Sequence, residues 1–376
     1  MVLGPGIGFS LFSWVVVQQM GGILTSGATD PCLGPMMVLP ALVHGRAWGI
    51  RQTHGEQTPD IVTSVTSLPL AFPALLTTDI DGPVNYTEFE GPKDSPTIVC
   101  VHGLGGSHLN WMAIAPSLAL NARVLALDLV GHGRTPTGSR IADIEGHRRL
   151  LNGFLSEVAG GPVILVGNSM GGLVATLQAA EQPDTVSGLM LIDPALPTSQ
   201  WGKAHPRAIA GFLLGVTPRL GESFLSQRRK YLSAEQSVHR VLAACCADSS
   251  RVPPDLVAAQ VQFLMSADRV ALDNAYLASA RSLSQIFLRP RSFAQKLRGV
   301  SQPTLLLHGD ADRLVPLAAS RQLSRAKPEW TFDIAEGAGH IPMMEVPEWT
   351  LDRITRWLGL EGADAARISA EATRRV

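Results

Sequence analysis

One serine lies in a sequence pattern that can hold it as a nucleophile. Ser169 is the middle residue of GNSMG at 167–171, between an apolar run at 162–167 and a helix-like stretch at 172–182. In such a strand-to-helix turn, the glycines permit a sharp backbone that holds the serine Oγ above the sheet. A helix that begins just after the serine also directs free N–H groups at an oxyanion forming there. Ordinary turns can share this short pattern, so other residues must support it.

A histidine and an aspartate follow Ser169 in the order that this chemistry needs. A serine hydroxyl requires a base to remove its proton and a carboxylate to orient that base. The run 303–309 is typical of a buried strand, and Asp312 in the loop after it is the predicted acid. His340 follows the predicted last strand in a glycine-rich loop and is the predicted base.

Two other aspartates compete with Asp312 for the role of the acid. Asp310 lies nearer the end of the same strand and could bond loop backbone instead. Asp193 ends the preceding predicted strand. Both alternatives stay open at the level of sequence.

Backbone amides are the predicted donors to the oxyanion. Met170 follows the nucleophile directly, and its N–H is the first candidate. Leu104 lies in the glycine-rich motif VHGLGGS at 101–107, and its N–H is the second. The glycines of that motif let the backbone come close to a bound carbonyl group.

With these motifs in place, the chain resembles the α/β-hydrolase superfamily. The resemblance covers roughly residues 76 to 360 and rests on an ordered set of motifs: VHGLGGS at 101–107, LDLVGHGRT at 127–135, VGNSMGG at 166–172, HGDADRLVP at 308–316 and GAGHIP at 337–342. Within the superfamily the chain resembles serine esterases, monoacylglycerol lipases and ring-cleavage-product hydrolases. It departs from epoxide hydrolases and haloalkane dehalogenases, which carry an aspartate where this chain has Ser169.

The order of apolar and amphipathic runs predicts an α/β fold. The α/β-hydrolase fold implied by the resemblance is an eight-stranded, mostly parallel sheet with helices on both faces and a helical cap inserted after the sixth strand. The predicted strands are 76–80, 84–89, 97–101, 124–129, 163–166, 189–192, 304–307 and 331–334. The first two form an antiparallel pair around a tight turn. Helices are predicted to begin near residues 110, 141, 170, 316 and 347.

The alternation divides the chain into four predicted parts. They are an N-terminal extension (1–75), an α/β-hydrolase core (76–196 and 302–362), a helical cap (197–301) and a C-terminal tail (363–376). Apolar residues of the cap could line an acyl pocket or form the cap's own core: Phe212, Leu213, Leu214, Val216, Phe224, Phe263, Leu264, Met265, Tyr276, Leu277, Ile286 and Phe287.

Charge is uneven along the chain. Residues 199–299 hold 14 Lys and Arg against 6 Asp and Glu, a balance of +8, whereas the whole chain carries −1. Such a charge run is usually a solvated surface, and an anionic membrane face is the alternative. The sequence contains no basic module interleaved with aromatic residues, so nucleic acid is not expected as a partner.

The N-terminal segment leaves the location of the protein open. Residues 1–29 contain no charged side chain, and 9–17 is strongly apolar, yet glycines and glutamines interrupt it. A marginal membrane anchor, a flexible extension and a start assigned too early all agree with this pattern. We expect a cytoplasmic protein, with membrane association through this segment as the alternative.

The predicted activity is cleavage of a carboxylic ester with an apolar acyl or alcohol group. No cofactor and no metal are expected, and the four cysteines do not suggest a disulfide framework. Hydrolysis of a carbon–carbon bond in a ring-cleavage product is the second candidate. It ranks lower because those relatives usually place tryptophan after the catalytic histidine, where this chain has Ile341. A ligand-binding protein without turnover is the third candidate.

Overall fold

The computed structural model describes residues 70, 72–203 and 205–359. The apolar segment at 9–17 and the tail at 363–376 lie outside the described residues. Among the helices of the described part, none is both long enough and apolar enough to cross a membrane.

The predicted eight-stranded sheet is confirmed. Its order is β1-β2-β4-β3-β5-β6-β7-β8, and β1 and β2 run antiparallel as predicted. β2 also pairs antiparallel with β4, and every later pairing is parallel. The strands are β1 (Leu76–Asp79), β2 (Pro83–Phe89), β3 (Thr97–Val101), β4 (Arg123–Leu127), β5 (Val163–Asn168), β6 (Val186–Ile192), β7 (Thr304–Gly309) and β8 (Thr331–Ala335).

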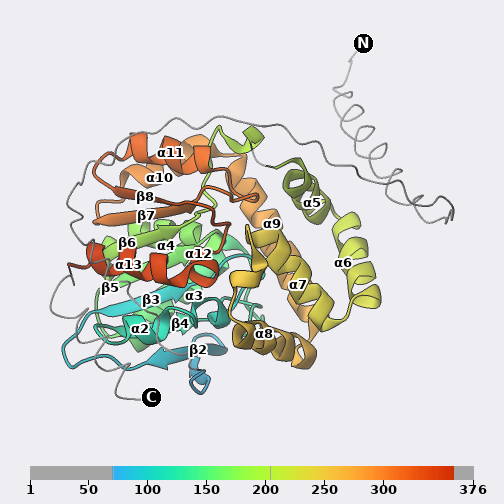
Figure 1. Ribbon diagram of the computed structural model, residues 1–376, viewed down its shortest axis with the longest axis horizontal. Coiled ribbons are helices and arrows are strands. Elements are labelled where there is room, and N and C mark those ends of the chain that lie inside the picture. The colour runs from blue at the N-terminus through green and yellow to red at the C-terminus, as the bar shows by residue number, and fades with distance from the viewer. Residues whose placement is uncertain (1–69, 71, 204, 360–376) are drawn as a thin grey trace, which may run out of the picture. The chain divides into compact units, whose positions relative to one another are not determined.

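The central strands read as apolar runs because helices cover both faces of the sheet. All six residues of β5 and of β7 are buried, as parallel strands covered on both sides require. One face packs with α3 (Ile144–Phe154) and α4 (Met170–Glu181). The other packs with α2 (Ala115–Leu118) and α13 (Pro347–Trp357). Figure 1 shows these helices around the sheet.

Two predicted helix starts are wrong by a few residues, and capping side chains explain the difference. The helix predicted near residue 110 is a 3-10 turn, η1 (His108–Trp111), which a capping box of Ser107 and Asn110 initiates. The helix predicted near residue 141 begins at Ile144, because the Asp143 side chain accepts the Gly146 N–H at 2.6 Å. Helices α4, α11 (Leu317–Ala326) and α13 begin at or next to the predicted residues.

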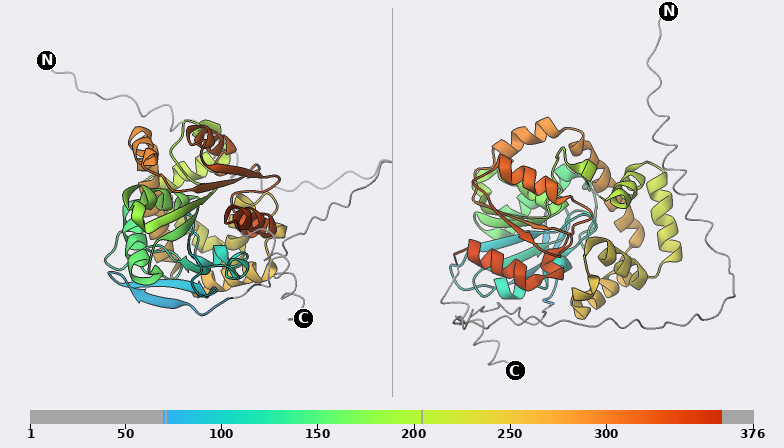
Figure 2. Two further views of the ribbon diagram at one scale, coloured as in Figure 1. Left: turned by 90° about the vertical axis from the view of Figure 1, so that its left-hand side faces the viewer. Right: turned by 45° about the horizontal axis from the view of Figure 1, so that its top comes forward.

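A helical insertion, residues 201–298, separates β6 from β7. Its elements are η4 (Trp201–Lys203), α5 (Pro206–Val216), α6 (Leu220–Tyr231), α7 (Ala234–Cys245), η5 (Ser249–Arg251), α8 (Pro254–Ser266), α9 (Arg269–Phe287) and α10 (Pro290–Arg298). Figures 1 and 2 show α5 to α8 gathered beside one end of the sheet. The insertion contacts loops at the carboxyl ends of the strands, where open α/β sheets bind ligands: Tyr276 lies against Gly105, and Ala275 against Gly131.

The apolar residues of the insertion divide between interior and surface. Phe212, Ile286 and Phe287 pack on the core face that carries α4, and Phe263 and Leu264 pack on the other. Leu213, Phe224 and Met265 are 41%, 46% and 73% exposed, so these three do not belong to the insertion's own core.

Candidate active site

Ser169 occupies the sharp turn between β5 and α4. Its backbone has φ 53° and ψ −119°, a conformation that non-glycine residues rarely adopt. Hydrogen bonds hold this strained backbone in place: the Ser169 N–H donates to Ile192 O at 3.0 Å, and Ser169 O accepts from Ala195 N at 3.0 Å. The sequence pattern predicts this turn, and its strained form is typical of an exposed nucleophile.

Gly171, two residues after Ser169, permits a close approach between α4 and the end of β3. A Cβ added to Gly171 would lie 2.1 Å from Val101 O, so no larger residue fits between α4 and the end of β3. On the same side, a Cβ at Gly103 would lie 3.0 Å from the Cβ of Ser169. The loop after β3 therefore lies directly beside the candidate nucleophile.

The two predicted oxyanion donors belong to the residue that follows Ser169 and to the loop after β3. Met170 is the first residue of α4, so its N–H has no acceptor within the helix. Leu104 lies in a turn that Gly106 N closes on Gly103 O at 3.1 Å, and Gly105 adopts φ +73° there. Leu104 is the second residue of that turn, so its N–H takes no part in the closing hydrogen bond.

His340 and Asp312 form a direct hydrogen bond. Nδ1 of His340 lies 2.7 Å from Oδ2 of Asp312, and both side chains are buried. Oδ1 of Asp312 accepts from Leu314 N at 2.7 Å and Val315 N at 3.0 Å. Burial opposes ionisation of Asp312, but His340 and these amides outweigh it, and the pKa of Asp312 lies below its ordinary value. The arrangement holds a carboxylate against the imidazole.

The loop that carries His340 is attached to the nucleophile turn. Nδ2 of Asn168, the residue before Ser169, donates to His340 O at 3.0 Å. On its other side, His340 N donates to Cys245 O at the end of α7, at 2.6 Å. The predicted nucleophile, acid and base thus come from the loops that follow β5, β7 and β8.

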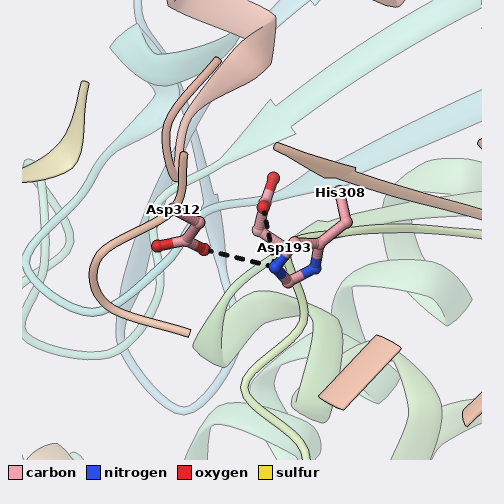
Figure 3. A group of neighbouring side chains, drawn as sticks. All are labelled: Asp193, His308 and Asp312. Carbon is pink, nitrogen blue, oxygen red and sulfur yellow. Dashed lines mark ion pairs between the residues drawn. The ribbon is translucent and has the colours of Figure 1, made fainter. Parts of the chain in front are cut away.

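The two alternative acids, Asp310 and Asp193, have different surroundings in the structure. Asp310 is exposed, and its Oδ1 accepts from Gly337 N at 2.7 Å, which agrees with the backbone role considered for it. Asp193 is fully buried, and its Oδ1 accepts from Gly309 N at 2.9 Å. Asp193 lies close to Asp312, as Figure 3 shows.

Sequence reasoning missed Glu345. This buried side chain accepts hydrogen bonds from Gly339 N at 2.8 Å, Asp248 N at 2.8 Å and Ala247 N at 3.1 Å. It therefore connects the loop of His340 to the insertion. The available signal was a single charged residue inside the apolar run IPMMEVP at 341–347.

We expect Glu345→Ala to destabilise the protein and to lower its activity. The change leaves three N–H groups without their acceptor, a buried one at Gly339 and two partly buried ones at Ala247 and Asp248, at a total cost of about 3 kcal/mol. The melting temperature should fall by roughly 6–12 °C for a domain of this size. Calorimetry measures the fall, and Glu336→Ala, an exposed glutamate of the same loop, is the control. Equal melting temperatures for the two variants would contradict the role given to Glu345.

Comparison with known proteins decides the family. The model of the alpha/beta hydrolase fold family matches residues 96–347. The chain belongs to the α/β-hydrolase fold family. The fold and the resemblance predicted from the motifs are thereby confirmed.

The family members most similar to this chain include lipases and esterases. The sn-1-specific diacylglycerol lipase ABHD11 of Mus musculus is 27% identical over 73% of this chain and 85% of its own length. The pimeloyl-[acyl-carrier protein] methyl ester esterase of Aeromonas hydrophila is 27% identical over 70% of this chain and 96% of its own. The solved structure of a thermophilic esterase from Thermogutta terrifontis is 26% identical, with a TM-score of 0.57, over 77% of this chain and 98% of its own.

Proposed function

We propose that the protein is a serine hydrolase that cleaves a carboxylic ester through an acyl-enzyme intermediate. One observation carries the proposal: the loop of the His340–Asp312 pair is hydrogen-bonded to Asn168, beside the strained Ser169. Relatives named as a diacylglycerol lipase and a methyl ester esterase support ester cleavage.

The proposed reaction assigns one role to each group. His340 removes the proton from Ser169 Oγ as that oxygen attacks the ester carbonyl carbon. The oxyanion forms between the N–H groups of Met170 and Leu104. His340 then donates its proton to the departing alkoxide, which leaves as the alcohol. Water, activated by the same base, hydrolyses the acyl-enzyme and restores Ser169. Asp312 stabilises the positive charge on His340 in both halves of the reaction.

The proposed substrate has an apolar acyl or alcohol group that lies beneath the helical insertion. Tyr276 of α9 supports this placement, because its ring lies 3.3 Å from the position of a Cβ on Gly105, in the proposed oxyanion loop. The apolar side chains that the insertion packs against the core supply further surface for such a group. We propose that the insertion acts as a cap over the site.

Activity against nitrophenyl esters of increasing acyl length tests this substrate class. Each buried methylene contributes about 0.8 kcal/mol, so kcat/KM should rise about three- to fourfold per carbon until the pocket is filled. A vinylogous diketo acid, the substrate type of carbon–carbon hydrolases, should not be cleaved. Activity on the diketo acid with none on any ester would replace the proposal by the second candidate. A kcat/KM that falls from acetate onward would contradict an apolar pocket.

A further inference from the structure

A second buried carboxyl group lies behind the proposed acid. Asp193 ends β6, Asp312 follows β7, and polar atoms of Asp193, His308 and Asp312 all lie within 4.8 Å of one another. Figure 3 shows the two carboxyl groups beside the ring of His308. Asp193 and the side chain of Asp312 are completely buried. Two carboxylates this close and this far from water cannot both be ionised without a cation to balance them.

His308 supplies no such cation. Its Nε2 lies 3.1 Å from Val315 O and its Nδ1 2.8 Å from Ser320 Oγ. A carbonyl oxygen only accepts, so Nε2 carries a proton, and in the neutral ring Nδ1 accepts from the serine hydroxyl. Burial also lowers the pKa of His308 to about 4, so the ring is neutral at neutral pH. A protonated Nε2 has no lone pair for a metal ion either, which argues against a metal site in this cluster.

The hydrogen bonds indicate which carboxyl group holds the negative charge. Asp312 accepts from two backbone amides and from His340. Among the described residues, Asp193 accepts a hydrogen bond only from Gly309 N, and His308 Nε2 lies at the longer distances of 3.5 Å from Asp193 and 3.7 Å from Asp312. Oδ2 of Asp193 is buried and has no hydrogen-bond partner among the described residues, so no donor competes with a proton on this oxygen. Burial and the nearby Asp312 raise the pKa of Asp193 well above its ordinary value.

We propose that Asp193 is a neutral carboxylic acid that donates a hydrogen bond to Asp312 and thereby positions the proposed acid of the triad. The pair shares one proton, with the negative charge on the oxygen that faces His340. This role rests on the proposed function, because it gives Asp193 a place behind the catalytic base. Asp193 is a positioning residue, since it acts through Asp312 and not on the substrate.

Other titratable groups near the pair do not neutralise it. Glu345 adds negative charge and so favours the protonated form of Asp193. Cys245 lies near Asp312, and burial raises the pKa of its thiol to about 12, so it stays neutral. His340 is the group that gains a positive charge during the proposed reaction, and Asp312 alone holds the hydrogen bond to it.

Two substitutions distinguish a neutral Asp193 from an ionised one. The amide of Asp193→Asn still donates to Asp312, so we expect kcat/KM within about threefold of wild type and an acid limb of the pH profile within about 0.3 unit. Asp193→Ala removes the donor, and kcat/KM should fall about 10- to 100-fold. Asp312 then attracts the protonated base more strongly, so the acid limb should move to higher pH by about half a unit to one unit.

If Asp193 were ionised, the acid limb of the pH profile would shift in the opposite direction from that expected for Asp193→Ala. Either substitution would then remove a negative charge near His340, and the acid limb would move to lower pH by about one unit. That result for Asp193→Asn would overturn the proposal. The rate at which a fluorophosphonate labels Ser169, measured against pH, reports the same base without any assumption about the ester.

Infrared difference spectroscopy tests the proton directly and needs no activity. Wild type should show the C=O stretching band of a buried protonated carboxyl group that Asp193→Asn lacks and Asp310→Asn keeps. The absence of that band would overturn the proposal even if Asp193→Ala failed to fold. If the probe and every ester failed to react while the band was present, the proposed function would fail and the protonated state of Asp193 would stand.

Discussion

Replacing Ser169 by alanine is expected to lower kcat by about 10⁴-fold or more against every ester that wild type cleaves. The change removes the oxygen that forms the acyl-enzyme, and no neighbouring group replaces it in the proposed reaction. The fold should survive, because the backbone bonds of residue 169 to Ile192 and Ala195 do not involve its side chain. Initial rates with a nitrophenyl ester measure the loss, and the melting temperature checks the fold.

A matched serine and a covalent probe complete this experiment. Ser187→Ala changes an exposed serine of β6 and should keep wild-type activity. A fluorophosphonate should label wild type and Ser187→Ala but not Ser169→Ala. Wild-type turnover in Ser169→Ala would remove the basis of the proposed mechanism. Tight binding of ligand to wild type, with neither labelling nor turnover, would favour a ligand-binding protein of this fold.

The second large effect concerns the acid. Asp312→Asn should lower kcat/KM by about 10³- to 10⁴-fold, because an amide cannot stabilise the charged imidazole and can hold His340 in the wrong tautomer. The substitution keeps the size of the side chain and one oxygen, which can still accept from Leu314 and Val315. The loss should therefore appear in the rate and not in the melting temperature.

Asp310→Asn is the control for that substitution. Asp310 lies two residues away, is exposed, and bonds the backbone of Gly337. Its amide still offers an oxygen to that N–H, so activity should stay within about threefold of wild type. A large loss in Asp310→Asn together with a small one in Asp312→Asn would exchange the roles given to the two residues.

The sequence predicts the nucleophile turn and most of the sheet because their signals are local. Backbone conformation at Ser169 follows from the glycines within two residues of it, and the strands beside it are continuous apolar runs. The order of motifs along the chain then locates the loops of Asp312 and His340. Helix starts depended on single capping residues such as Asp143, so those predictions missed by a few residues.

Contacts between distant parts of the chain were not predictable in the same way. Glu345 is bonded to Asp248, which is 97 residues away, and Asp193 meets Asp312 only because β6 and β7 are neighbours. Apolar composition also could not tell which face of an insertion helix would be covered. Leu213 and Met265 are exposed to solvent, although their direct neighbours in the sequence, Phe212 and Leu264, pack against the core.

The insertion leaves and rejoins the sheet at adjacent strands. These strands are parallel, so the chain leaves at the carboxyl end of β6 and rejoins at the amino end of β7. Ile192, the last residue of β6, is paired with Leu307, and Thr304, the first residue of β7, lies three residues before it, roughly 10 Å along the strand. The length and shape of the connection can change while β6 and β7 keep their register, provided that it still crosses from one edge of the sheet to the other. Hydrogen bonds to the rest of the chain limit such changes, among them those of Cys245 O to His340 N, of Ala247 and Asp248 to Glu345, and of Ser279 to His147. Chimaeras that keep these attachments should therefore accept a foreign insertion and acquire its substrate preference.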